Sequence, residues 1–197
     1  SNCLSNEELK QLTLLTYLHE FDLSGKDFLD AITPMAIKEH KIKFHKMEPK
    51  VSVAKLNRAW GDQKGNKVRI NLMKLPSEQD IVNTLFHELR HVKQEEVMSI
   101  LSLEKIFKAL GLEKPWEKYV ERVYGYFSKT KRDFAQKCIS ARKKYVSPEK
   151  DYKAYFNNFL EVDARKSGDA AEKEYLRQQR IFDDIWYDDN KHFLTQN

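Results

Sequence analysis

The five residues His87-Glu88-Leu89-Arg90-His91 form an HExxH motif within a segment whose apolar residues recur at helical spacing. Residues four positions apart lie on one face of a helix, so the two imidazoles can point at one metal ion. Glu88 follows the first histidine and can reach a water molecule bound to that ion. The motif predicts a site for one zinc ion, with His87 and His91 as ligands and Glu88 as general base. The competing interpretation is a helix with two solvated histidines and an ion-paired glutamate.

A catalytic zinc site usually has three protein ligands, so a third must come from outside the motif. The longer metzincin pattern fails because Gln94 and Val97 occupy the positions of its glycine and histidine. We favour Glu161 as the third ligand. Asp163 is its chief rival, although the two side chains point about 200° apart on a helix. The alternative use of Glu161 is an ion pair with Arg165. The remaining histidines, expected at the surface or packed, are His19, His40, His45 and His192.

The motif helix is predicted over residues 77–98. Ser77 and Asp80 form a variant of the capping box at its start. Upstream, residues 41–73 alternate between apolar and polar side chains on both sides of a turn cluster at 61–66. This pattern predicts a small sheet containing a hairpin.

The helix that carries the third ligand is predicted over residues 152–182. Glu161, Ala164 and Gly168 share one face of it, and the two small residues would let another helix approach closely. The remaining predicted elements are N-terminal helices at 3–40 and a basic helical insert at 101–150. Two helices must therefore meet to complete the metal site.

The 197 residues are enough for one domain with its own core, and no Pro/Gly/Ser-rich linker divides them. We expect a single α+β domain that is mostly helical, with the small sheet of the N-terminal half packed on the motif helix. Cys3 and Cys138 form no paired motif and are expected to be free thiols. No apolar run is long enough to span a membrane. We expect a cytoplasmic protein without a membrane partner, unless a leader preceding Ser1 has been removed.

The formal net charge is +5, and residues 103–153 hold 14 Lys and Arg against 7 Asp and Glu. This excess supports an alternative function, a non-catalytic scaffold that binds a protein partner or nucleic acid through its basic surface. Seven basic residues of the insert carry this reading, namely Lys129, Lys131, Arg132, Lys137, Arg142, Lys143 and Lys144. Their charges are distributed around helices, so we expect only weak, sequence-independent binding of nucleic acid.

Taken together, the predicted strands, the HExxH helix and the later Glu-x-x-Ala segment resemble the gluzincin group of zinc peptidases. The closest likenesses are the ImmA/IrrE-like metallopeptidases of phage and mobile elements, and the soluble part of the CAAX prenyl protease type. Glu161 and Ala164 match the Glu-x-x-Ala-Asp/Asn pattern of these families, whereas Arg165 departs from it. The resemblance covers about residues 50–97 and 155–170. It implies a zincin-like fold and hydrolysis of a protein or peptide substrate.

That chemistry needs a donor for the oxyanion that forms when water attacks a peptide carbonyl. The sequence offers four candidates near the third-ligand helix, which are Tyr152, Tyr155, Tyr175 and Arg165. Each tyrosine could equally serve as core packing.

Overall fold

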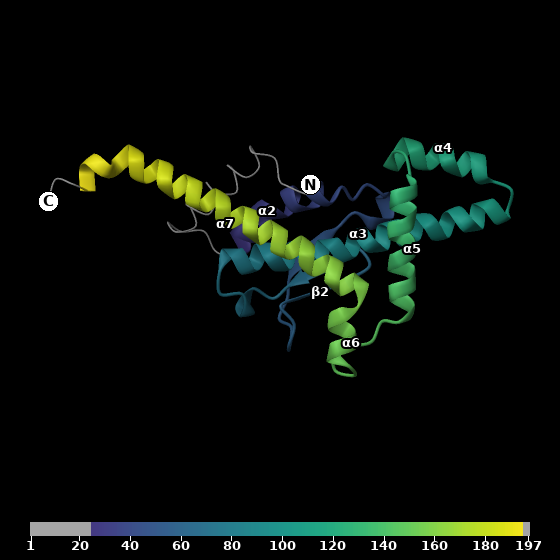
Figure 1. Ribbon diagram of the computed structural model, residues 1–197, viewed down its shortest axis with the longest axis horizontal. Coiled ribbons are helices and arrows are strands. Elements are labelled where there is room, and N and C mark those ends of the chain that lie inside the picture. Colours follow the sequence, from purple (N-terminus) through teal and green to yellow (C-terminus); the bar gives the residue numbers. More distant parts are fainter. Residues whose placement is uncertain (1–24, 195–197) are drawn as a thin grey trace.

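Helices form most of the structure, and a three-stranded sheet lies in the N-terminal half (Figure 1). The computed structural model describes residues 25–194. Its elements are α2 (Gly25–His40), the 3-10 helix η1 (His45–Met47), β1 (Lys50–Val53), β2 (Gly61–Lys64), β3 (Lys67–Ile70), the 3-10 helix η2 (Leu72–Lys74), α3 (Glu78–Ala109), α4 (Glu113–Tyr124), α5 (Lys129–Lys143), α6 (Tyr152–Asn157) and α7 (Phe159–Leu194). The mostly helical α+β class is confirmed. The predicted helices at 3–40 lie partly outside the described residues.

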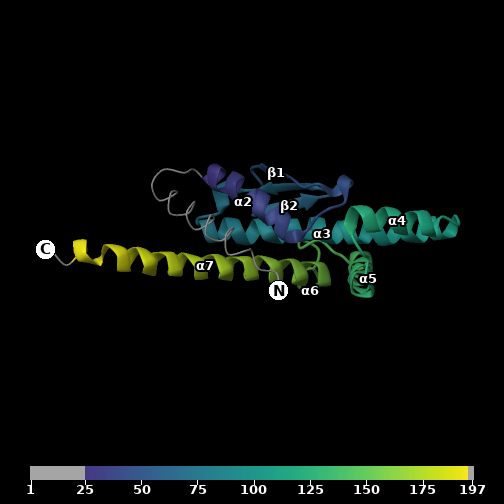
Figure 2. The same ribbon diagram turned by 90° about the horizontal axis from the view of Figure 1, so that it is seen from above.

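Helix α3 carries the HExxH motif and is the central element of the core. Ser77 caps it, because its hydroxyl accepts a hydrogen bond from the backbone N–H of Asp80 at 3.3 Å. Leu85, Leu89 and Val92 are completely buried on its apolar face. Figure 2 shows the sheet and α7 on opposite sides of α3. The helix ends at Ala109 rather than at the predicted residue 98.

The sheet has the strand order β1-β3-β2, with β1 parallel and β2 antiparallel to β3. Val68 and Ile70 of β3 are completely buried against the helices. The position predicted for the hairpin turn was wrong. Residues 61–66, which were expected to form the turn, contain strand β2 itself. The turn is only two residues long, and Gly65 adopts a φ of 61° there. β2 was missed because an edge strand with polar side chains gives no alternating pattern.

The strand expected from residue 41 onward does not form. The backbone N–H groups of Lys43 and Phe44 donate hydrogen bonds to the carboxylate of Glu96, each at 2.7 Å. Glu96 is completely buried on α3 and also binds the ammonium of Lys93 at 2.6 Å. The segment therefore satisfies its backbone donors on a side chain of α3 instead of in a sheet.

The single helix expected over 152–182 is broken at Asn158, which has an extended backbone. The side chain of Asn158 accepts a hydrogen bond from the backbone N–H of Leu160 at 3.0 Å and so caps α7. The two elements are α6 and α7, and α7 continues to Leu194. Glu161 consequently lies in the first turn of α7.

The small residues of α7 allow the close helix contact predicted for them. Ala164 is completely buried. A Cβ atom added to Gly168 would lie 2.7 Å from the backbone oxygen of Asn83 on α3. This spacing brings the start of α7 to the HExxH motif.

The basic insert comprises the end of α3 together with α4 and α5. Trp116 of α4 stacks on Phe107 of α3, with ring centroids 4.9 Å apart. On α5, Cys138 is a buried free thiol, and burial raises its pKa to about 12. Cys3 lies outside the described residues. No helix within residues 25–194 is both long and apolar enough to cross a lipid bilayer.

We predict that Gly168→Ala lowers the free energy of unfolding by about 1–3 kcal/mol, because the new methyl group would clash with the Asn83 backbone. Chemical denaturation measures this change. Ala170→Gly is the matched control at an exposed position of the same helix, and it should cost about 1 kcal/mol through helix propensity alone. A Gly168→Ala protein more stable than the parent would contradict the close contact.

Candidate metal centre

Three side chains from two helices converge at one point. His87 and His91 come from α3, and Glu161 comes from the first turn of α7. The Nε2 atoms of the two histidines are 3.2 Å apart. The Glu161 carboxylate oxygens lie 3.5 Å from His87 Nε2 and 3.6 Å from His91 Nε2. The three residues predicted as ligands therefore form one cluster that could hold a metal ion.

The distance between the two imidazole nitrogens fits a tetrahedral centre. Metal–ligand bonds of about 2.0–2.1 Å place neighbouring ligand atoms of a tetrahedron about 3.3 Å apart, and the two Nε2 atoms are 3.2 Å apart. The contacts of 3.5 and 3.6 Å are made by different oxygens of Glu161, Oε2 with His87 and Oε1 with His91. One ligand atom from each of the three residues lies within 4.8 Å of the other two, so the side chains can converge on one ion.

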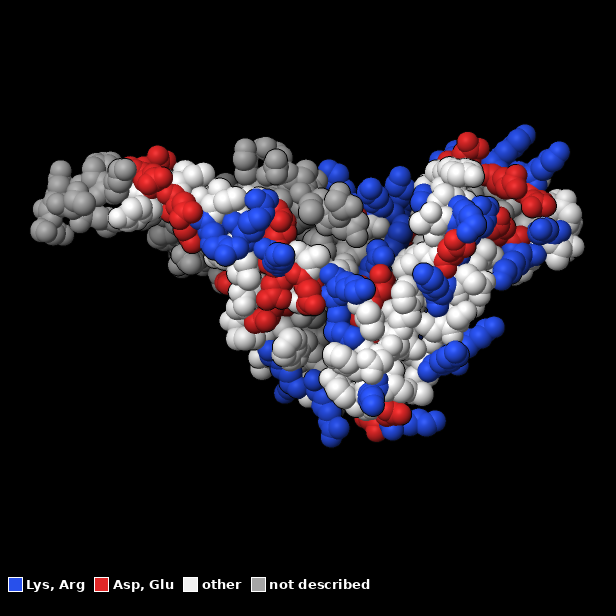
Figure 3. Space-filling model, in the orientation of Figure 1, with Lys and Arg blue, Asp and Glu red and all other residues white. Residues whose placement is uncertain are grey.

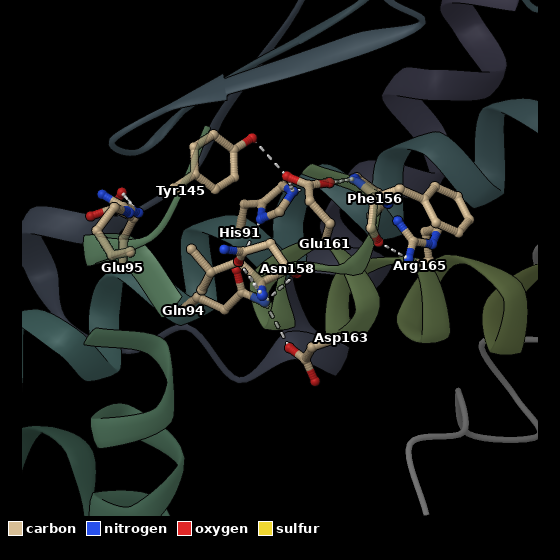
Figure 4. A network of polar contacts seen from close by, with 12 residues as sticks. His91, Gln94, Glu95, Tyr145, Phe156, Asn158, Glu161, Asp163 and Arg165 are labelled. Atoms are coloured by element: carbon tan, nitrogen blue, oxygen red, sulfur yellow. Dashed lines mark hydrogen bonds and ion pairs between the residues drawn. The ribbon is translucent and has the colours of Figure 1, made fainter. Parts of the chain in front are cut away.

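One carboxylate oxygen of Glu161 accepts a hydrogen bond, and the other does not. Oε1 accepts a hydrogen bond from the hydroxyl of Tyr145 at 2.8 Å (Figure 4). Oε2 is buried and accepts no hydrogen bond from the described residues. Burial alone would raise the pKa of Glu161, but the nearby imidazoles of His87 and His91 and the Tyr145 hydroxyl lower it well below its usual range. A buried, ionised oxygen beside two imidazoles is a position where a cation would be favourable.

His91 is oriented by Gln94, one turn further along α3. The Nδ1 atom of His91 lies 2.9 Å from Gln94 Oε1, and donation across this contact leaves Nε2 free to bind a metal. The amide of Gln94 in turn donates hydrogen bonds to the Leu160 carbonyl at 3.0 Å and to Asp163 at 2.8 Å. Gln94 thus connects the histidine to α7.

Asp163, the rival ligand, lies outside the cluster. Its carboxylate accepts two hydrogen bonds from Arg90, at 2.8 and 3.1 Å, as well as the one from Gln94. Figure 4 shows it on the far side of Gln94 from His91. Asp163 therefore contacts Gln94, which in turn contacts His91, and does not belong to the cluster. The guanidinium of Arg165 lies over the ring of Phe156, 3.7 Å from its centroid.

Glu88 is buried between α3 and the edge strand β2. A Cβ atom added to Gly61 of β2 would lie 3.0 Å from Glu88 Cγ. Burial raises the pKa of Glu88, the charges of His87 and His91 lower it, and that of Glu161 raises it again, with a net rise. A carboxylate with a raised pKa beside the cluster is suited to accept a proton.

Tyr145 is the site residue that the sequence analysis missed. It lies in the segment between α5 and α6, where no periodicity places it near Glu161. Its ring packs edge-on against Tyr155, with centroids 5.9 Å apart, and the Glu161 carboxylate raises the pKa of both hydroxyls in addition to their burial. Tyr175, by contrast, is buried against Phe28 in the core.

The other described histidines take no part in the cluster. His40 is buried on α2, and burial lowers its pKa to about 4. His45 is exposed in η1. Comparisons of the chain with protein-family models, with curated proteins and with solved structures gave no match. The function is therefore inferred from the geometry of the site.

We predict that Gln94→Met weakens metal binding by about 10–100-fold, because His91 loses the partner that fixes its orientation. A competition titration against a chromophoric chelator measures the affinity. Gln136→Met makes the same chemical change at an exposed position of α5 and should leave the affinity unchanged. Equal affinities for Gln94→Met and the parent would show that Gln94 does not position the ligand.

Proposed function

We propose that the protein is a zinc-dependent metallopeptidase that hydrolyses a peptide bond of a protein or peptide substrate. The observation that carries this proposal is the cluster of His87, His91 and Glu161, with Glu88 buried beside it. Two imidazoles and one carboxylate are a typical ligand set of catalytic zinc sites, in which the fourth position stays open for water.

The donor set supports zinc in particular. Imidazole nitrogen suits zinc and other first-row transition metals, whereas magnesium and calcium prefer oxygen ligands. Three protein ligands that leave a fourth position open also suit zinc, which is four-coordinate in most protein sites. When bound, zinc would lower the pKa of a water molecule and polarise the substrate carbonyl.

The burial of Glu88 beside the cluster and its raised pKa support a role as general base. Its carboxylate would take a proton from the attacking water and pass it to the leaving amine. The raised pKa makes the protonated form easier to reach than for a solvated glutamate. Tyr145 is then a candidate for the oxyanion donor: its hydroxyl lies 2.8 Å from Glu161, and its O–H would turn from that carboxylate to the oxyanion.

The surface around strand β2 suits an extended peptide. β2 pairs only with β3 among the described strands, so its other edge can offer backbone hydrogen bonds to a substrate. Gly61 at the start of β2 touches Glu88, which brings such a peptide close to the general base. A hollow of about 660 Å³ beside β2 is bounded by the preceding loop and by Glu149. These features support a peptide as substrate.

We predict that Glu88→Gln retains the metal but loses peptidase activity by about 100-fold or more, because an amide cannot accept the proton. Activity is measured by mass spectrometry of new termini in a proteome-derived peptide library, and metal content by elemental analysis. Glu95→Gln is the matched control, since it removes the same charge from α3 at a residue that pairs with Arg142 outside the cluster.

A Glu88→Gln protein as active as the parent would exclude Glu88 as the base. A metal-loaded parent that cleaves no peptide of the library would contradict the peptidase proposal and favour the non-catalytic scaffold.

A further inference from the structure

A different cavity lies beside α3, between α7 and α5, and its wall is rich in cations. Its volume is about 460 Å³, which suits a small molecule. The cationic side chains that line it are Lys41, Lys43, Arg90, Lys93, Lys131 and Lys166, and we call it the basic cavity. Among the described residues, its wall contains only two carboxylates, Glu39 and Asp163. Figure 3 shows Lys and Arg side chains on both sides of the hollow between α7 and α5.

Two of these cations are already neutralised by protein groups. Arg90 donates two hydrogen bonds to Asp163. The ammonium of Lys93 donates to Glu96 at 2.6 Å and to the backbone carbonyl of Lys41 at 2.9 Å. These pairs hold the wall together, and the other four lysines exceed the one remaining wall carboxylate, Glu39, by three charges.

The surplus lysines are Lys41, Lys43, Lys131 and Lys166. Within residues 25–194, the ion pairs at the cavity are Arg90 with Asp163 and Lys93 with Glu96, and none involves these four. Like charges around a concave surface repel one another, and the surface focuses their field on the cavity. A bound anion would relieve this repulsion.

Positive charge is also concentrated close to Lys93. The ammonium groups of Lys93 and Lys131 both lie near the ring of Tyr124, 4.6 and 4.8 Å from its centroid. Two cations thus share one aromatic side chain at the wall.

Lys41 occupies a backbone conformation that glycine would adopt with less strain. Its φ is 52°, directly after the last residue of α2. Lys41 lines the cavity at this position, and its backbone carbonyl accepts the hydrogen bond from Lys93.

We propose that the basic cavity binds a small, multiply charged anion that carries phosphate groups. Lysine ammonium groups bind phosphate oxygens as point charges, and several of them match a ligand with more than one phosphate. Phe86 and Phe134 add apolar wall for the rest of the ligand. A concave site of this size favours a small molecule over nucleic acid, which needs cations along an extended face.

The basic cavity adjoins the metal centre but is separate from it. Asp163 lies in its wall and also accepts the hydrogen bond from Gln94, which orients His91. The proposed anion site does not need a metal or peptidase activity. Its test can therefore be made on metal-free protein and fails or succeeds independently of the proposed function.

The test is calorimetric titration of the metal-free full chain with inorganic tripolyphosphate at low salt. We expect one saturable site per chain. Lys43→Gln/Lys166→Gln should bind at least about tenfold more weakly, because each lost ammonium removes a charge-assisted hydrogen bond. The control Lys137→Gln/Lys143→Gln removes the same charge from exposed positions of α5 outside the cavity and should bind like the parent. Circular dichroism verifies that both variants fold.

Absence of saturable binding would overturn the proposal. Equal weakening of binding in both double variants would also overturn it, because the affinity would then depend only on the overall charge of the protein. Parallel titrations with ATP and with a soluble inositol polyphosphate distinguish a nucleotide from a lipid headgroup, and cavity-dependent binding of either supports the site. A DNA duplex that binds more tightly than tripolyphosphate, and equally to all three proteins, would overturn it.

Discussion

The close packing of α7 on α3 determines whether a metal centre can exist in this protein. Two histidines on α3 are within reach of each other through helical spacing alone, but the carboxylate must come from the second helix. Ala164 and Gly168 allow that approach, and Glu161 then lies buried beside both imidazoles. An ionised oxygen without a hydrogen-bond partner is costly in a protein interior unless a cation compensates it. The packing of the two helices therefore also assembles the cluster that could hold an ion.

The polar groups around the cluster connect three parts of the fold. Gln94 joins His91 to α7, and Asp163 joins Gln94 to Arg90. Arg90 and Asp163 also form part of the wall of the basic cavity. The residues that contact His91 through Gln94 therefore also belong to the wall of that cavity. The metal centre and the proposed anion site share a boundary of charged, hydrogen-bonded side chains instead of an apolar wall.

The features that could be predicted from the sequence are those determined by local spacing. The HExxH motif places His87 and His91 on one helical face, and Ser77 marks the start of that helix. The parts that could not be predicted depend on contacts between distant segments. The segment before β1 binds Glu96 instead of pairing as a strand, although Glu96 follows it by more than fifty positions. Tyr145 reaches Glu161 from a segment without regular structure, so no periodic pattern points to it.

We propose that His87, His91 and Glu161 bind one zinc ion. The most direct measurement is elemental analysis of the full chain purified without added metal, combined with X-ray absorption at the zinc edge. We expect one zinc per chain, with two imidazole nitrogens and carboxylate oxygen at about 2.0–2.2 Å. We also expect that Glu161→Ala loses the carboxylate ligand and most of the metal. A parent without zinc, or a Glu161→Ala protein with full zinc content and an unchanged absorption spectrum, would contradict this proposal.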